Sequence, residues 1–111
     1  MSRYCFALDL KNDATLIDEY ERHHKNVWPE ILDSLKAAGI EQMEIYRTGN
    51  RLFMIIDASD IFSLEKMSMS DPANQKVQEW EALMWKYQQA LPQANPGEKW
   101  VPMTSIFMLT D

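Results

Sequence analysis

The residues with the clearest chemical potential lie in one short segment, "DEYERHHKNVWPEI", at residues 18–31. It holds His23 and His24, the two histidines of the chain. Histidine exchanges protons near neutral pH, which suits general acid or base chemistry. Tyr20 lies four residues before His24, a spacing that places both side chains on one helical face. From this spacing alone, His24 is expected more often as a packed core histidine than as a catalyst. The alternative is that His24, partly buried beside the Tyr20 phenol, acts as a general acid or base.

His23 is expected to play a different part from its neighbour. Successive helical residues are rotated by about 100°, so His23 is predicted at the helix edge, solvated or flanking the site. Two diverging histidines do not easily bind one metal ion. The single cysteine, Cys5, provides no disulfide or cysteine-based metal framework. We therefore expect no metal site.

Tryptophan is the other notable residue type, with four in 111 residues. Most large aromatic side chains are expected in a core or an interface. Trp85, in "MWKY" at residues 84–87, falls beside the apolar stripe of its predicted helix. Its ring could stack on the C–H face of a sugar, although packing alone explains it equally well.

Helical periodicity surrounds the histidines. Apolar residues recur at spacings of three and four from Ala14 onward, which predicts a helix to about Lys25. Pro29 suits a first helical position better than an interior one. We predict a kink at Trp28–Pro29 and a second helical piece that ends at Gly39.

The remaining pattern predicts strands and two further helices. Helices are expected at 60–70 and 71–91, the latter capped by Asp71 with Pro72 at its first position. A Gly49–Asn50 turn joins two strands as a hairpin. The four expected strands span 3–10, 41–48, 51–58 and 101–110.

The resulting order is β-α-β-β-α-β, which is the split arrangement of the ferredoxin-like fold. We predict an α+β sandwich with an antiparallel sheet and helices on one face. The other face needs cover, because an exposed apolar sheet face is a large patch. A second copy supplies that cover, so we predict a homodimer of the dimeric α/β barrel type.

Length and charge limit the possible functions. The chain fits one domain over residues 1–111. Its net charge of −6 argues against nucleic acid or an anionic membrane as a partner. No apolar run approaches the roughly 20 residues of a membrane span, and no leader pattern precedes the domain. We expect a cytoplasmic protein. The absence of a Gly-rich phosphate loop or nucleophile elbow disfavours phosphoryl and acyl transfer.

These motifs resemble the L-rhamnose mutarotase family. The similar segments are "EYERHHKNVWPEI", "EIY", "NRLFMII", "WKY" and "LPQANPGE", which together cover about the whole chain. The resemblance implies a small, cofactor-free dimer of ferredoxin-like fold that binds a monosaccharide. It implies that His24 is the proton donor and that Tyr20 contacts the sugar.

The resemblance also assigns three further substrate-binding positions. The family's tandem tryptophans fall on Met84 and Trp85, and another sugar-contacting tyrosine falls on Met43. Trp85 would stack near the 6-methyl group, and the methionines would form adaptable apolar walls. With "MEIY" and "KVQEWEALMWKYQQALP", these departures favour the L-fucose mutarotase branch, with L-rhamnose as the alternative substrate. A cofactor-free monooxygenase or a small-ligand-binding dimer is the alternative from another class.

Overall fold

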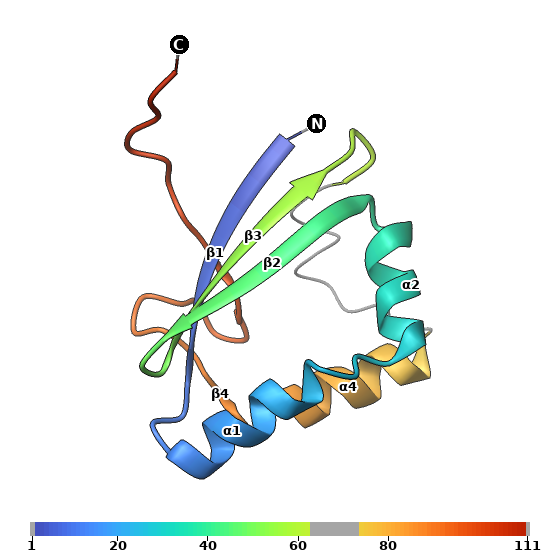
Figure 1. The fold of residues 1–111 in the computed structure, drawn as a ribbon, viewed down its shortest axis with the longest axis vertical. Coiled ribbons are helices and arrows are strands. Elements are labelled where there is room, and N and C mark those ends of the chain that lie inside the picture. Colours follow the sequence, from blue (N-terminus) through green and yellow to red (C-terminus); the bar gives the residue numbers. More distant parts are fainter. Residues whose placement is uncertain (1, 63–73, 111) are drawn as a thin grey trace.

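A curved antiparallel sheet forms the frame of the fold (Figure 1). The computed structural model describes residues 2–62 and 74–110. The strands lie in the order β2-β3-β1-β4, and β5 also pairs with β1, so β4 and β5 share the second edge of β1. The predicted α+β class and antiparallel sheet are confirmed. The strands are β1 (Ser2–Leu10), β2 (Ile40–Thr48), β3 (Arg51–Ala58), β4 (Gln88–Gln89) and β5 (Val101–Pro102).

The register of β1 and β3 determines which side chains form the core. Phe6 pairs with Met54 and Leu8 pairs with Leu52, and all four are buried. Side chains alternate between the two faces of a strand, so the even-numbered residues of both strands lie on one apolar face. That face carries the core, which the helices cover.

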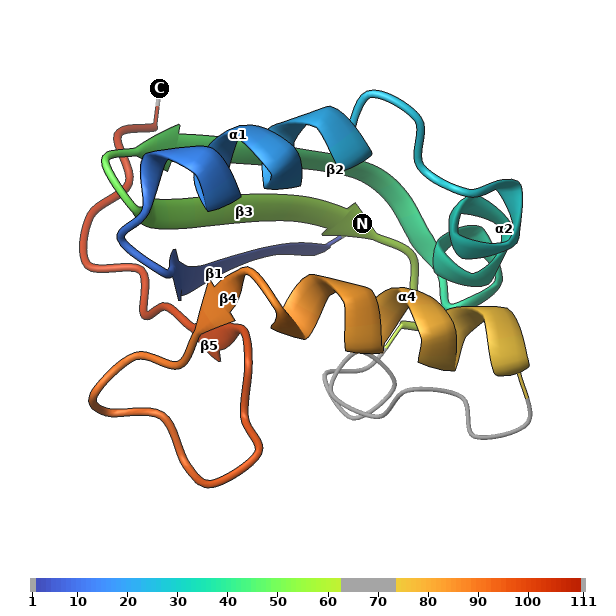
Figure 2. The same ribbon diagram turned by 90° about the horizontal axis from the view of Figure 1, so that it is seen from below.

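The helices of the described residues cover this face of the sheet, and Figure 2 shows α1 in front of β2 and α4 alongside β1. They are α1 (Ala14–His23), α2 (Pro29–Ala37) and α4 (Gln75–Trp85). The Asp13 carboxylate caps α1 by accepting hydrogen bonds from the N–H groups of Thr15 and Leu16. Pro29 opens α2, and Gly39 follows α2 with a φ of 98° that favours glycine. The predicted interruption and the stop at Gly39 are both confirmed.

The helix α4 differs from its predicted span of 71–91. It begins at Gln75, where the Asn74 side chain accepts a hydrogen bond from the N–H of Val77. The predicted cap residues at 71 and 72 lie outside the described residues, as does 63–70 of the predicted helix 60–70. The predicted end at Leu91 is wrong. The chain leaves the helix because the Tyr87 carbonyl accepts from the N–H of Lys11 and the next two residues join the sheet as β4.

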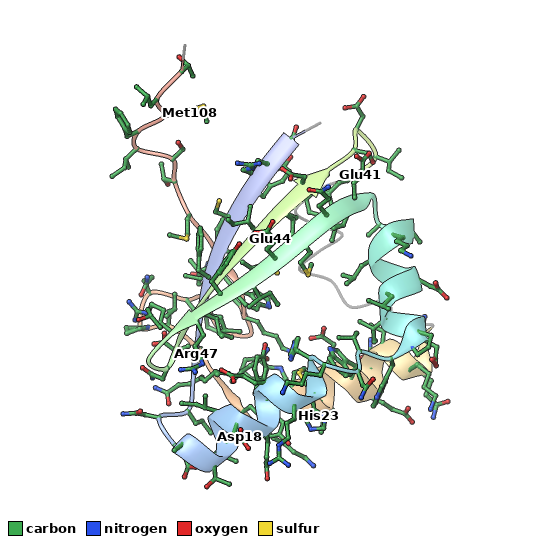
Figure 3. All side chains as sticks on the ribbon, in the orientation of Figure 1. Asp18, His23, Glu41, Glu44, Arg47 and Met108 are labelled. Atoms are coloured by element: carbon green, nitrogen blue, oxygen red, sulfur yellow. The ribbon has the colours of Figure 1, made fainter. Side chains whose placement is uncertain are left out.

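The predicted strand 101–110 is wrong beyond Pro102. Phe6 pairs with Pro102, and Met103 N–H donates to the Cys5 carbonyl at 2.8 Å. Antiparallel pairing from there reaches the end of β1, at Ser2, opposite residue 106. Residues 107–110 would lie beyond that end, and within the described part of the chain residues 103–106 form no strand either. We call residues 103–110 the C-terminal arm; Figure 3 shows Met108 on this arm, away from the sheet and helices. Its exposed large apolar residues are Met103, Ile106, Phe107, Met108 and Leu109.

The second face of the sheet has no helix over it in the described part of the chain. By strand register this face carries Cys5, Phe53 and Ile55, all half-buried. Arg3 forms an ion pair with Asp57 at 3.1 Å. Arg51 donates two hydrogen bonds, of 2.8 and 3.2 Å, to the buried carboxylate of Asp9. The uncovered face is thus apolar in its middle and bordered by ion pairs. No helix among the described residues is long and apolar enough to cross a membrane.

Candidate functional site

Tyr20 and His24 lie together on the inner side of α1, as the four-residue spacing predicts. Tyr20 is 3% exposed and belongs to the main apolar cluster, and His24 is half-buried. Their rings are 4.4 Å apart between centroids. The end of α1 makes this contact possible, because His24 is the C-cap residue and its ring turns back along the helix.

The hydrogen bond of His24 defines how its protons are arranged. Nδ1 lies 2.9 Å from the main-chain oxygen of Tyr20. A carbonyl oxygen only accepts, so Nδ1 carries the hydrogen and donates it. In the neutral ring, Nε2 then holds the free lone pair, and no described residue hydrogen-bonds to it. This arrangement leaves Nε2 able to take up and return a proton.

Burial shifts the pKa values of His24 and Tyr20. The pKa of His24 lies below 6.5, chiefly because burial disfavours the charged ring. The hydrogen bond to the Tyr20 carbonyl raises this pKa, and the nearby charge of His23 lowers it. The ring is therefore neutral, and basic at Nε2, at pH 7. Burial raises the pKa of Tyr20 to about 12. The phenol stays protonated and remains a hydrogen-bond donor.

His23 is more enclosed than the sequence predicts. It is half-buried, and its Nε2 shares a hydrogen bond of 3.2 Å with the hydroxyl of Tyr87. Its ring also contacts Trp80, with centroids 6.5 Å apart. Figure 3 shows His23 on α1, near the helix that precedes Tyr87. Sequence reasoning missed this contact, since 64 positions separate the two residues.

The rings of His23, His24, Tyr20, Tyr87 and Trp80 form a closed circuit of contacts. Tyr20 contacts Tyr87 at 6.1 Å and His24 at 4.4 Å between ring centroids. Trp80 contacts His24 at 5.7 Å on the other side. Because each histidine ring contacts two other rings, both side chains are packed and do not extend into solvent. His23 therefore belongs to the same cluster as His24.

A cavity of about 470 Å³ opens beside this cluster. It is lined by Glu19, Arg22, His23, Asn26 and Tyr87. Its size falls within the range of small-molecule sites, and its lining offers both donors and acceptors. Tyr20 and His24 do not line it, but Tyr87 contacts Tyr20 and lines the cavity as well. The cavity is thus separated from Tyr20 by the His23–Tyr87 pair.

Gln88 is a polar residue of this cluster that sequence reasoning also missed. It follows Tyr87 directly and is buried. Its Nε2 donates a hydrogen bond of 3.4 Å to the Tyr20 hydroxyl. The local hint in the sequence that Gln88 is buried is its place between the aromatic residues of α4 and the apolar Leu91.

The comparisons with known proteins agree with this geometry. The family model described as L-rhamnose mutarotase matches residues 3–109. The chain belongs to the L-rhamnose mutarotase family.

Individual relatives cover nearly the whole chain. An L-fucose mutarotase of Xanthomonas campestris is 44% identical, over all of this chain and 90% of its own. An L-rhamnose mutarotase of Shigella flexneri is 30% identical, over 86% of this chain and 85% of its own. The crystal structure of an L-rhamnose mutarotase from Formosa agariphila superposes with a TM-score of 0.71. It is 23% identical and covers 99% of this chain and all of that one. The family and the ferredoxin-like fold predicted for the chain are both confirmed.

The other positions that the L-rhamnose mutarotase resemblance assigned to the sugar do not all meet at the histidines. Met84 is 3% exposed and shares the apolar cluster of Tyr20. Trp85 lies on the outer side of α4, 37% exposed, with the Lys99 ammonium 4.7 Å from its ring centre. Met43, on β2, packs against the second apolar cluster and lines a smaller hollow of about 220 Å³. The structure therefore pairs Tyr20 with His24, places Met84 in the apolar cluster of Tyr20, and leaves Trp85 and Met43 outside that cluster.

An ion pair ties α1 to the edge of the sheet. The guanidinium of Arg47, near the end of β2, hydrogen-bonds the Glu21 carboxylate, and Figure 3 shows Arg47 above α1.

Among the described residues, no group of three or more histidine, cysteine, aspartate or glutamate side chains could hold a metal ion. The chemistry that the site offers is proton exchange and hydrogen bonding.

Proposed function

We propose that this protein is a sugar mutarotase that interconverts the α and β anomers of a 6-deoxy-hexose, with L-fucose as its substrate. The observation that carries the proposal is the fixed tautomer of His24, whose Nδ1–H is held by the Tyr20 carbonyl at 2.9 Å. A half-buried imidazole that is neutral at pH 7 is suited to take a proton and give it back. Membership of the L-rhamnose mutarotase family supports the reaction class.

The reaction needs one proton to leave the sugar and one to arrive. Nε2 of His24 removes the proton of the anomeric hydroxyl, the C1–O1 bond becomes a carbonyl, and the bond from C1 to the ring oxygen breaks. The ring oxygen receives a proton, from the imidazolium or through water. Rotation about the C1–C2 bond and reclosure on the other face give the second anomer. The chemistry is redox-neutral and uses no cofactor, as expected from the family resemblance.

Tyr20 and Met84 complete this proposed site. The Tyr20 phenol, protonated and beside the imidazole, donates a hydrogen bond to a sugar hydroxyl. Met84 supplies an adaptable apolar wall in the same cluster. Trp85 and Met43 remain proposed sugar contacts from the family resemblance. Lys99 covers one face of the Trp85 ring, so a sugar would stack on the other face or displace the Lys99 side chain.

The choice of L-fucose over L-rhamnose rests on two lines of support. The Xanthomonas relative at 44% identity is named an L-fucose mutarotase, whereas the Shigella relative at 30% is named an L-rhamnose mutarotase. Methionine stands at 43 and 84, where the family resemblance places sugar-contacting aromatic residues. Loss of a hydroxyl and a ring changes which sugar hydroxyl orientations can be bound.

We further propose that the protein is a cytoplasmic homodimer. The uncovered sheet face, with Phe53 and Ile55 in its middle, needs a partner surface to exclude water. The C-terminal arm exposes several large apolar side chains, among them Phe107 at 79%. A second copy covers both features at once. The cytoplasmic location rests on the single free cysteine, since proteins of oxidising compartments favour disulfides.

Saturation-transfer NMR of reducing sugars tests the function directly. The protein is expected to speed α/β exchange of L-fucose without consuming it, and EDTA is expected to leave the rate unchanged. A panel that includes L-rhamnose, D-glucose and D-galactose ranks the substrates. Oxygen uptake with a phenolic substrate would instead indicate a monooxygenase. Sugar binding without faster exchange would indicate a binding protein, and either result would overturn the proposal.

A further inference from the structure

The side-chain amide of Gln88 makes a hydrogen bond through its nitrogen but not through its oxygen. The residue is buried, with 5% of its surface exposed. Nε2 donates to the Tyr20 hydroxyl, and Oε1 has no hydrogen-bond partner among the described residues. Turning the amide over exchanges the two ends and leaves the deficit, because a phenol can donate or accept. Buried polar atoms without a partner are rare and destabilising.

Two contacts fix the position of this amide. The main chain of Gln88 pairs with Leu10 of β1, and its side chain is anchored at Tyr20. Tyr87, the preceding residue, lines the cavity beside the histidines. Tyr20 in turn lies against the ring of His24. The unsatisfied oxygen is therefore held one side chain away from the proposed acid/base.

We propose that Gln88 is a further substrate-binding residue, whose Oε1 accepts a hydrogen bond from one hydroxyl of the sugar bound beside Tyr20 and His24. The inference rests on the proposed mutarotase function and names a residue that reads the substrate. A sugar is rich in hydroxyl donors. The His23–Tyr87 pair separates the cavity of about 470 Å³ from Tyr20, so the sugar satisfies the buried oxygen when this pair parts to admit it. The Nε2 bond to Tyr20 occupies a lone pair of the phenol and directs its O–H toward the same sugar.

Such a residue contributes to specificity more than to general affinity. A site built to hydrogen-bond a particular hydroxyl rejects a sugar that lacks it, because the buried group is then left unpaired. A residue with a purely structural role, or one whose oxygen is satisfied by a buried water, would show no such dependence on one hydroxyl. The two roles therefore differ in a measurable way.

The experiment compares Gln88→Met with Gln89→Met. Both residues lie in β4, but Gln89 is exposed and makes its sheet contact through the main chain. Anomer exchange is measured for L-fucose and for its 2-, 3- and 4-monodeoxy analogues. We expect Gln88→Met to lower kcat/KM for L-fucose by about ten-fold or more. For the analogue that lacks the hydroxyl bound by Gln88, kcat/KM of the wild type should be lower than for L-fucose by a similar factor. The variant should have the same kcat/KM for this analogue and for L-fucose. Gln89→Met should keep the wild-type values.

The results separate this inference from the function on which it rests. If the wild type speeds exchange of no aldose, the proposed function fails, and the role of Gln88 fails with it. If the wild type is active and Gln88→Met lowers kcat/KM equally for all four sugars, or not at all, the role of Gln88 alone is overturned.

A measurement on the wild type guards against a variant that fails to fold. The side-chain amide signals of Gln88 and Gln89 are followed by ¹H–¹⁵N NMR during titration with L-fucose. The Gln88 signal is expected to shift and the Gln89 signal to stay in place. Saturating sugar without a shift of the Gln88 signal would contradict the proposed contact.

Discussion

The imidazole of His24 donates its Nδ1–H to the main-chain oxygen of Tyr20, the residue whose phenol ring lies against it. One residue thus sets both the tautomer and the packing of the histidine. The lone pair on Nε2 is the consequence, since the other ring nitrogen is already committed. The proposed mutarotase reaction depends on that single nitrogen.

Replacement of His24 by alanine is expected to reduce anomer exchange of L-fucose to the uncatalysed rate. The variant removes the only group proposed to carry the proton, while the half-buried position tolerates a smaller side chain. Saturation-transfer NMR gives the rate, and circular dichroism checks the fold. Lys25→Ala, at the exposed neighbouring position, is the matched control and should keep full activity. Wild-type exchange rates in His24→Ala would rule out His24 as the acid/base.

The pH dependence of catalysis should reflect the lowered pKa of His24. The free enzyme needs the neutral ring, so kcat/KM is expected to fall as pH drops through a pKa below 6.5. The neighbouring charge of His23 contributes to that lowering. In His23→Gln the acid limb should therefore move to higher pH. A limb that stays in place in this variant would show that the two histidines are not electrostatically coupled.

Stability should respond to the same shift. The pKa of His24 is near 6.5 in the unfolded chain and lower in the folded protein. Between those two values the unfolded state binds more protons, so the free energy of unfolding falls as pH decreases through this window. Urea denaturation at pH 7.5 and pH 5 measures the loss. His24→Gln cannot titrate there and should lose less; an equal loss in both proteins would contradict the shift.

Local spacing explains why part of this site is predictable from sequence. The four-residue interval between Tyr20 and His24 places both on one helical face, and the alternation of Phe6, Leu8 and Leu10 gives β1 its buried side. These features depend on residues close in the chain. The interruption before Pro29 follows equally from the chemistry of proline.

The other parts of the site depend on contacts between residues far apart in the chain, which cannot be predicted from local sequence. His23, at the end of α1, meets Trp80 of α4 and Tyr87 just after α4 in three dimensions, and no spacing rule connects residues so far apart. Gln88 and Gln89 form β4 through main-chain pairing with β1, without any apolar alternation of their own. The predicted strand at 101–110 keeps only Val101 and Pro102 paired with β1, and no local pattern marks where that pairing stops.

Aromatic residues placed at the two methionine positions should act differently. Met43 is half-buried on β2, so Met43→Tyr is expected to fold and to raise kcat/KM for L-rhamnose relative to L-fucose. Met84 is 3% exposed within a filled cluster, so Met84→Trp is expected to lower the free energy of unfolding by about 1–3 kcal/mol. NMR exchange rates and urea denaturation provide the two measurements. An unchanged sugar preference in Met43→Tyr would count against Met43 as a sugar contact.

The C-terminal arm should decide the oligomeric state. Ile106 and Phe107 are 94% and 79% exposed in one copy, and water disfavours so much apolar surface on an extended segment. If a second copy covers the arm, a charge placed there opposes association because it would be buried without a partner. Phe107→Asp is therefore expected to shift the protein from dimer to monomer in light scattering after size exclusion. Thr104→Asp adds the same charge to the arm at a polar, exposed position and should leave the dimer intact. A monomeric wild type, or a dimeric Phe107→Asp, would show that the arm does not hold two copies together.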